Sequence, residues 1–142
     1  MIAGAALMCL ALNAYWEAGN QDYNSMVAVN QVVMNRVASD KYPNEPCEVI
    51  LQGPTRPSWK NPEEHYPVRH RCQFSWYCDG KSDKAHEELP WARALIVADN
   101  VLRGKIKDPT KGATHYHARY VKPYWSASLN NTVIYGSHKF YQ

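Results

Sequence analysis

The sequence lacks the apolar runs and the charge clusters that mark membrane proteins and nucleic-acid-binding proteins. Its apolar start, residues 1–12, is shorter than the roughly 20 residues that a membrane-spanning helix needs. That stretch has neither the basic leader nor the cleavage site of a signal peptide, so we interpret it as part of a buried helix. The net charge is only +3, and basic residues gather only around Arg69-His70-Arg71. We therefore expect no stable membrane insertion and no nucleic-acid partner.

Motifs for metal binding and for acyl transfer are also absent. There is no His-Glu-x-x-His sequence, Cys72 and Cys78 are farther apart than the paired cysteines of zinc sites, and Ser75 lacks a Gly-x-Ser-x-Gly elbow. We expect no metal and no cofactor. Two alternatives stay open. One is a zinc amidase or peptidase whose ligands come from a His and Cys set, namely His115, His117, His70, Cys47, Cys72 and Cys78; the other is a cysteine peptidase built on Cys78 with a histidine.

The four cysteines allow three disulfide pairings, and the sequence does not choose among them. Cys9 lies in the apolar first segment, and we expect it to be a reduced core residue. Cys72 and Cys78 bracket residues 73–77. In an oxidising compartment, a bridge between these two, or from either one to Cys47, would fix that segment.

Aromatic residues are the strongest compositional bias. The chain has ten Tyr and five Trp but only two Phe. Tyr and Trp pair an apolar ring face with a hydrogen-bonding edge, which suits contacts with sugars as well as the rim of a small core. The composition therefore favours a carbohydrate ligand, with simple core filling as the alternative for any single ring.

Three helices are predicted by the apolar spacing. The first spans residues 2–17 and ends at Gly19, the second spans residues 23–38, and the third starts near Pro90 and ends at Gly104. Ser82 and Asp83 are placed to cap a separate helical segment before Pro90. In the second helix, polar residues off the apolar stripe are either solvated or one wall of a cleft; they are Asn30 and Asn35.

The rest of the chain is predicted to be loops and short strands. Residues 41–71 form a Pro-rich loop insertion, with one helical turn at residues 47–51 and a surface excursion at 59–70. Three strands follow near the end of the chain and make a small antiparallel sheet; they are residues 114–118, 132–135 and 137–141. The fold class is therefore α+β, and a chain of this length fits one catalytic domain, residues 1–142, without a separate binding module.

Glu17 is the acidic residue with the most distinctive setting. It ends the first helix beside Tyr15 and Trp16, and both the apolar neighbours and the helix dipole disfavour its charged form, which would leave it a proton to donate. The structural alternative is an ordinary helix-end glutamate. The other acids lie in less apolar surroundings; they include Asp22, Asp79, Asp99 and Asp108.

One acid is enough for glycoside cleavage when the substrate supplies its own nucleophile. The 6-hydroxyl of a muramic sugar can attack its own anomeric carbon and leave an anhydro end. Glu17 would then act first as an acid and afterwards as a base.

Several segments in one order resemble a known family, the spore-cortex-lytic cell wall hydrolases of the SleB and CwlJ type, which also occur in phages. The resemblance covers most of the chain. It rests on Tyr15-Trp16-Glu17-Ala18, Val27-Ala28-Val29, Val33-Met34-Asn35-Arg36-Val37, Cys47-Glu48-Val49-Ile50, Gln73-Phe74-Ser75-Trp76 with Asp79-Gly80, Tyr116-His117-Ala118, Pro123-Tyr124-Trp125, and residues 136–141.

The resemblance implies a lysozyme-like fold, with helices around a small antiparallel sheet, in which Glu17 is the catalytic acid. It implies a muramidase that acts on peptidoglycan glycan strands, cleaving the β-1,4 bond between N-acetylmuramic acid and N-acetylglucosamine by lytic transglycosylation. It also places a set of side chains in the substrate cleft: Gln73, Ser75, Tyr116, His117 and His138.

Two departures from the family pattern refine this expectation. Where the family often continues Arg-Gly-Glu after Glu-Ala, this chain has Gly19-Asn20-Gln21, so an amide replaces a second acid. The Pro-rich insertion and the missing signal and wall-binding module also differ from the spore enzymes.

We expect a monomeric phage endolysin, made in the host cytoplasm without a signal peptide and acting on the cell wall after release. The further alternative is a non-catalytic wall-binding module.

Overall fold

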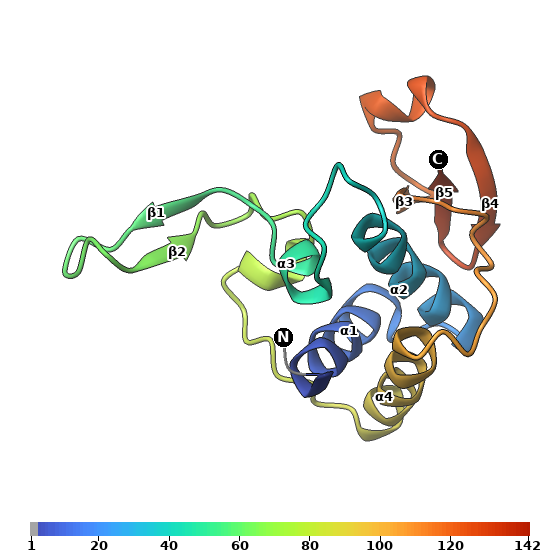
Figure 1. Cartoon of the computed structure of the whole chain (residues 1–142), viewed down its shortest axis with the longest axis horizontal. Coiled ribbons are helices and arrows are strands. Elements are labelled where there is room, and N and C mark those ends of the chain that lie inside the picture. The colour runs from blue at the N-terminus through green and yellow to red at the C-terminus, as the bar shows by residue number, and fades with distance from the viewer. Residues whose placement is uncertain (1–2) are drawn as a thin grey trace.

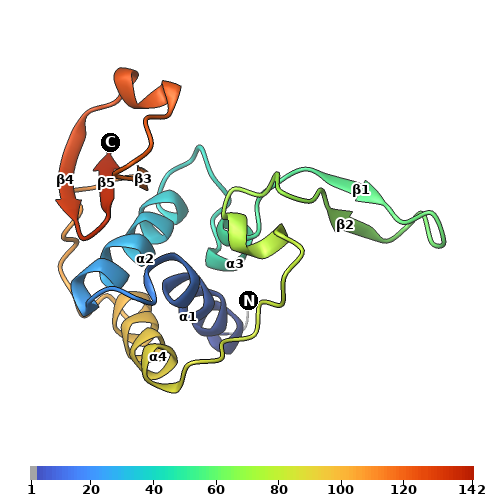
Figure 2. The same cartoon turned by 180° about the vertical axis from the view of Figure 1, so that it is seen from behind.

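The first helix, α1 (Ala3–Ala18), occupies the middle of the molecule in the computed structural model, which describes residues 3–142. It contacts α2 (Tyr23–Val37), α3 (Pro46–Ile50) and α4 (Glu88–Leu102), as Figures 1 and 2 show from opposite sides. Its helical prediction is confirmed, although the expected starting residue, Ile2, lies outside the described residues. Leu10 and Ala14 are fully buried, so α1 forms the centre of the core.

The second helix follows the sequence prediction closely. Asp22 is its N-cap and accepts a hydrogen bond from the Ser25 amide at 2.9 Å. The predicted apolar stripe is buried, with Met26, Val29 and Val33 all inaccessible to solvent.

The start of α4 differs from the prediction. The helix begins at Glu88, two residues before Pro90, because the first-turn amides have no helical partner and a proline there loses nothing. No separate helix lies directly before it, because residues 82–87 have no regular secondary structure. The Asp83 carbonyl accepts from the Trp16 indole at 2.9 Å, and the Tyr15 hydroxyl accepts from the amides of His86 and Glu87. These contacts with α1 hold the segment out of a helix.

The three predicted strands form one antiparallel sheet in the order β3–β5–β4. The strands are β3 (His115–Ala118), β4 (Asn131–Tyr135) and β5 (His138–Tyr141). Tyr116 pairs with Phe140, and Ala118 pairs with His138, so these side chains share one face of the sheet. His115 and His117 lie on the other face. The mixture of helices and antiparallel strands confirms the α+β prediction.

The Pro-rich region contains more regular structure than a loop insertion. After α3, strands β1 (Thr55–Pro57) and β2 (His65–Pro67) pair as an antiparallel hairpin that projects away from the helices (Figure 1). The expected helical turn at 47–51 is α3. A short 3-10 helix, η1 (Ser75–Cys78), follows the hairpin, and a second, η2 (Tyr124–Ser128), lies between β3 and β4.

The expectation of a reduced Cys9 is wrong. Cys9 forms a disulfide with Cys47, because α3 packs beside α1 and brings their Cα atoms to 5.5 Å. Cys72 pairs with Cys78, which was one of the open possibilities. Within residues 3–142 no helix combines the length and the apolar character needed to cross a membrane.

Candidate active site

Glu17 lies in the last turn of α1, and its carboxyl group is paired with a residue 99 positions away. The Tyr116 hydroxyl, from β3, donates a hydrogen bond to Glu17 Oε1 at 2.5 Å. Oε2 has no protein hydrogen-bond partner among residues 3–142. One oxygen is therefore held in place, and the other is available for proton exchange with a ligand.

The surroundings of this pair favour the protonated acid. Burial raises the pKa of Glu17 above its usual value, and the hydrogen bond from Tyr116 lowers that pKa by a smaller amount. Burial and the adjacent carboxylate together raise the pKa of Tyr116 well above its ordinary range, so the phenol stays a donor. A carboxyl group with a raised pKa and a fixed orientation can act as a general acid.

A buried polar network supports the helix one turn below Glu17. Asn13 lies four residues earlier on the same helical face. Its Oδ1 accepts from the Trp76 indole at 3.1 Å, and its Nδ2 donates to Asn30 Oδ1 at 3.4 Å. Asn30 is therefore buried against α1 rather than solvated. This network joins η1 and α2 to the end of α1 that carries the acid.

Aromatic side chains hold Tyr116 in position. Its ring centroid lies 5.4 Å from that of Phe140, 6.4 Å from that of Phe74 and 5.1 Å from that of His138. His138 is buried with no partner for Nδ1 among the described residues, and burial lowers its pKa. The imidazole thus packs against the ring of the residue that bonds to Glu17, and its lowered pKa favours the neutral form.

The remaining expected cleft residues fall into two groups. Gln73 and Ser75 are exposed on either side of the buried Phe74, at the start of η1. His117 is buried on the opposite face of the sheet. Its Nδ1 contacts the Ala118 carbonyl at 2.7 Å, so it donates there, and its Nε2 accepts from the Tyr141 hydroxyl at 2.8 Å. The fold does not bring His117 together with Glu17.

The other acids singled out in the sequence have structural partners of their own. None is hydrogen-bonded to Glu17 or Tyr116. Asp22 caps α2, Asp79 accepts from the Lys81 amide, Asp99 pairs with Arg103, and Asp108 accepts from Thr110, Gly112 and Asn35. Glu17 is thus without a second carboxylate as a hydrogen-bonding partner.

Gln21, the amide at the position of a second family acid, has a structural contact. Its Oε1 accepts from the Ser137 amide at 3.2 Å, which joins the α1–α2 turn to the β4–β5 turn. Gly136 has a φ of 54°, and a Cβ there would collide with Gln21 and Ser25. The contact positions the sheet, and with it Tyr116, over the end of α1.

The ligand set of the zinc alternative is not assembled within the described residues. All four cysteines are in disulfides, so none is a thiolate. Across residues 3–142, no group of three or more His, Cys, Asp or Glu side chains is arranged to hold a metal. The disulfide of Cys78 likewise leaves the cysteine-peptidase alternative without a nucleophile.

The Glu17–Tyr116 pair is the feature that sequence reasoning missed. Glu17 and Tyr116 were each predicted to belong to the site, but not as a bonded pair. Tyr15 and Trp16 were the residues predicted to surround the acid. Their polar atoms instead contact the segment before α4, and Tyr116 contacts the carboxyl group. No local pattern signals a contact across 99 residues. Trp16 does line a small hollow of about 290 Å³ at the end of α1, together with Gly19 and Asn20.

Solved structures with the same fold were found by comparison. The crystal structure of the catalytic domain of the Bacillus cereus SleB protein has a TM-score of 0.73 and 22% identity, covering 100% of this chain and 93% of that one. The catalytic domain of the germination-specific lytic transglycosylase SleB from Bacillus anthracis gives the same score and identity, covering 99% and 97%. This similarity establishes the lysozyme-like fold of the SleB catalytic domains.

Sequence comparison establishes the family. No curated protein matches the chain significantly. The model of the cell wall hydrolase family matches residues 20–141, a range that begins three residues after Glu17 and includes Tyr116 and His138. Because this match spans most of the sequence, the chain belongs to the cell wall hydrolase family, whose members act on peptidoglycan.

Proposed function

We propose that the protein is a muramidase that cleaves the β-1,4 bond between N-acetylmuramic acid and N-acetylglucosamine by lytic transglycosylation. The observation that carries the proposal is the Glu17–Tyr116 pair: a single acid with a raised pKa and one unpartnered oxygen. The family supplies the substrate class, and one structural relative is itself named a lytic transglycosylase.

Glu17 acts twice in the proposed reaction. Its Oε2 proton passes to the bridging oxygen as the bond to the anomeric carbon breaks, so N-acetylglucosamine leaves with a 4-hydroxyl. The resulting carboxylate accepts the proton of the muramic 6-hydroxyl, and that oxygen bonds to the anomeric carbon. Water is not consumed, and Glu17 ends protonated as it began.

Tyr116 supports both steps without exchanging its own proton. Its hydrogen bond stabilises the carboxylate that forms in the first step, and its raised pKa keeps the proton on the phenol. We place Gln73, Ser75 and His138 in contact with the sugar, because the first two are exposed beside Phe74 and the third lies against Tyr116. His117 supports the sheet from its other face in this proposal.

Replacing Glu17 tests the proposal directly. Glu17→Gln keeps the shape and a hydrogen-bond acceptor for Tyr116 but removes the proton, so lysis of purified sacculi should fall about 100- to 10,000-fold. Circular dichroism checks that the fold is retained, and Glu48→Gln, at an exposed position on α3, is the matched control. An active Glu17→Gln protein would end the proposed role of this residue.

Product masses separate transglycosylation from hydrolysis. Mass spectrometry of digested peptidoglycan should show muramic ends that are one water lighter than hydrolytic ends. Products carrying the added water would show that an external water is the nucleophile and would refute the transglycosylase step, while leaving the acid role of Glu17 intact.

A further inference from the structure

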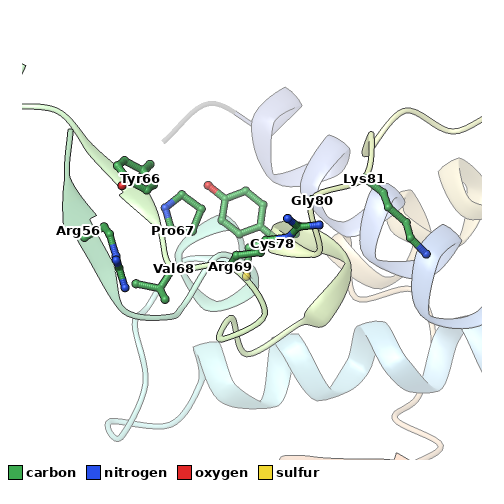
Figure 3. Close-up of a pocket in the computed structure, with 9 residues that line it drawn as sticks. Arg56, Tyr66, Pro67, Val68, Arg69, Cys78, Gly80 and Lys81 are labelled. Atoms are coloured by element: carbon green, nitrogen blue, oxygen red, sulfur yellow. The ribbon is translucent and has the colours of Figure 1, made fainter. Parts of the chain in front are cut away.

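One hollow on the described surface does not have Glu17 among its lining residues. It is a groove of about 680 Å³ between the β1–β2 hairpin and the segment that follows η1, and Figure 3 shows its lining side chains. We call it the hairpin groove. Its lining residues are Arg56, Tyr66, Pro67, Val68, Arg69, Tyr77, Cys78, Gly80 and Lys81.

The side chains that line the hairpin groove include cations and no acid. Arg56, Arg69 and Lys81 are its only charged lining residues, and all three are exposed. None of these side chains has a hydrogen bond or an ion pair with an acceptor in residues 3–142, where the one ion pair joins Arg103 to Asp99. Since the chain carries a net charge of only +3, this gathering of unpaired cations is a local feature that would attract an anion.

Arg69 lies against the backbone of the opposite wall of the groove. Its guanidinium lies against Gly80, whose φ is 83°, and a Cβ on that glycine would overlap the guanidinium atoms. Figure 3 shows Arg69 and Gly80 together in the middle of the groove, with Arg56 on the hairpin side. A planar guanidinium with free donors matches a carboxylate, which it can bind through two parallel hydrogen bonds.

The two walls of the groove are tied to each other. The His70 amide donates to the Cys78 carbonyl at 2.8 Å, and the Cys72–Cys78 disulfide closes the same corner. The Val68 amide donates to the Pro54 carbonyl at 2.9 Å across the base of the hairpin. Because these contacts fix the backbone of both walls, ordering of the backbone adds little to the cost of binding.

The same segment also connects the groove to the acid. Trp76, in η1, bonds to Asn13 one turn below Glu17, and the Asp83 carbonyl accepts from Trp16 next to it. Residues 76–83 therefore run from the support of the acid along one wall of the hairpin groove. The acid's supporting contacts and the lining of the groove therefore belong to one continuous segment of the chain.

We propose that the hairpin groove binds carboxylates of the peptidoglycan stem peptides while the glycan strand lies at Glu17. The inference rests on the proposed muramidase function and extends it to the peptide part of the substrate. Arg69 and Arg56 bind the carboxylates, and Tyr66 and Tyr77 flank the peptide with their rings. Among wall anions we choose the peptide carboxylate over the phosphate of wall polymers because it is covalently attached to the sugar that Glu17 acts on.

Binding to two forms of purified sacculi tests this assignment. Both forms are freed of phosphate polymers; one keeps its stem peptides, and the other is stripped of them by an amidase. The double variant Arg56→Gln, Arg69→Gln should bind peptide-bearing sacculi about tenfold more weakly than the unaltered chain, the sum of two exposed charge contacts. On the stripped glycan the two proteins should bind equally.

A matched control removes the same charge elsewhere. Lys105→Gln with Lys107→Gln alters two exposed lysines in the loop after α4, outside the groove, and should leave both affinities unchanged. Arg69→Lys keeps the charge but not the planar guanidinium. Its affinity for peptide-bearing sacculi should therefore lie between that of the unaltered chain and that of the double variant. Thermal unfolding confirms that each variant is folded.

Three results would overturn the proposal: equal weakening on both forms of sacculi, no weakening on either, or weakening only when phosphate polymers are left in place. Measurements are made on ice with the unaltered active site and repeated with Glu17→Gln. Failure of the proposed catalytic role would appear as lysis by Glu17→Gln. Failure of the proposal for the hairpin groove would appear only in the ratio of the affinities for peptide-bearing and stripped sacculi.

Discussion

The end of α1 and the β1–β2 hairpin hold their side chains in different ways. Around Glu17 the side chains contact one another: Tyr116 bonds to the acid, and Phe140, His138 and Phe74 surround Tyr116. In the hairpin, every residue of β1 is exposed, and the strand is held by backbone pairing with β2 and by contacts at its base. Trp59, near its tip, is 87% exposed.

This difference separates the residues that can do chemistry from those that can bind. A proton donor needs burial to raise its pKa and a fixed orientation, and only the packed region supplies both. Side chains on a hairpin without a core of their own keep their charge and stay accessible. Changes in the packed region should therefore affect stability and the rate, whereas changes in the hairpin should affect binding.

The largest expected contrast is in stability. Phe140 is fully buried against Tyr116 and Tyr135, so Phe140→Ala should lower the free energy of unfolding by about 3–5 kcal/mol. Tyr66→Ala on the hairpin should change it by less than about 0.5 kcal/mol. Urea unfolding measures both, and similar losses from the two variants would show that the hairpin shares the core.

The two disulfides extend the same contrast. Cys9–Cys47 spans 38 residues and joins two helices, so Cys9→Ser with Cys47→Ser should cost about 4 kcal/mol of unfolding free energy. Cys72–Cys78 spans only 6 residues, and Cys72→Ser with Cys78→Ser should cost about 2 kcal/mol. Only the second pair should also weaken binding to peptide-bearing sacculi. Equal binding losses would contradict the assignment of Cys72–Cys78 to the groove.

Removal of the Tyr116 hydroxyl should change the rate and its pH dependence. Tyr116→Phe loses a hydrogen bond to a charged group, worth about 1.5–3 kcal/mol, so kcat/KM should fall about 10- to 100-fold. That hydrogen bond lowers the pKa of Glu17, so its loss raises the pKa further. Activity that requires protonated Glu17 should then persist to higher pH.

The pH profile of turbidity loss with sacculi measures this shift. Tyr135→Phe is a suitable control, because the Tyr135 hydroxyl has no hydrogen-bond partner in residues 3–142 while its ring packs near Phe140. An unchanged alkaline limb in Tyr116→Phe would mean that Glu17 is not the group that limits activity at high pH.

The smallest expected effect is on stability as a function of pH. Burial raises the pKa of folded Glu17 above its usual 4.5, so this group's contribution to stability is fully present below pH 4.5 and is lost as the pH rises through the folded pKa. Glu17→Gln removes that loss. As the pH rises, the free energy of unfolding of the variant should therefore increase relative to that of the unaltered chain. The increase should be about 1.4 kcal/mol for each unit between the folded and unfolded pKa.

Chemical unfolding between about pH 4 and about pH 8 measures the difference in free energy between the two proteins. A difference that stays constant across this range would show that Glu17 has the same pKa in the folded and unfolded chain. Glu17 would then lack the raised pKa on which its proposed role as a general acid depends.

The amino-acid sequence by itself determined the elements and their class. Apolar spacing placed the main helices, and α4 was misplaced by only two residues because a proline is tolerated in a first turn. Alternation placed β3, β4 and β5. These features depend on neighbours along the chain, which the sequence displays.

Tertiary structure alone decided which distant groups meet. The Glu17–Tyr116 hydrogen bond, the Cys9–Cys47 disulfide, the separation of His117 from the acid and the cations of the hairpin groove all depend on how the elements pack. Local patterns do not encode such contacts, because burial and pairing are set by the whole fold. The sequence identified Glu17 as an acid in an apolar setting, and the fold supplied the partner that orients it.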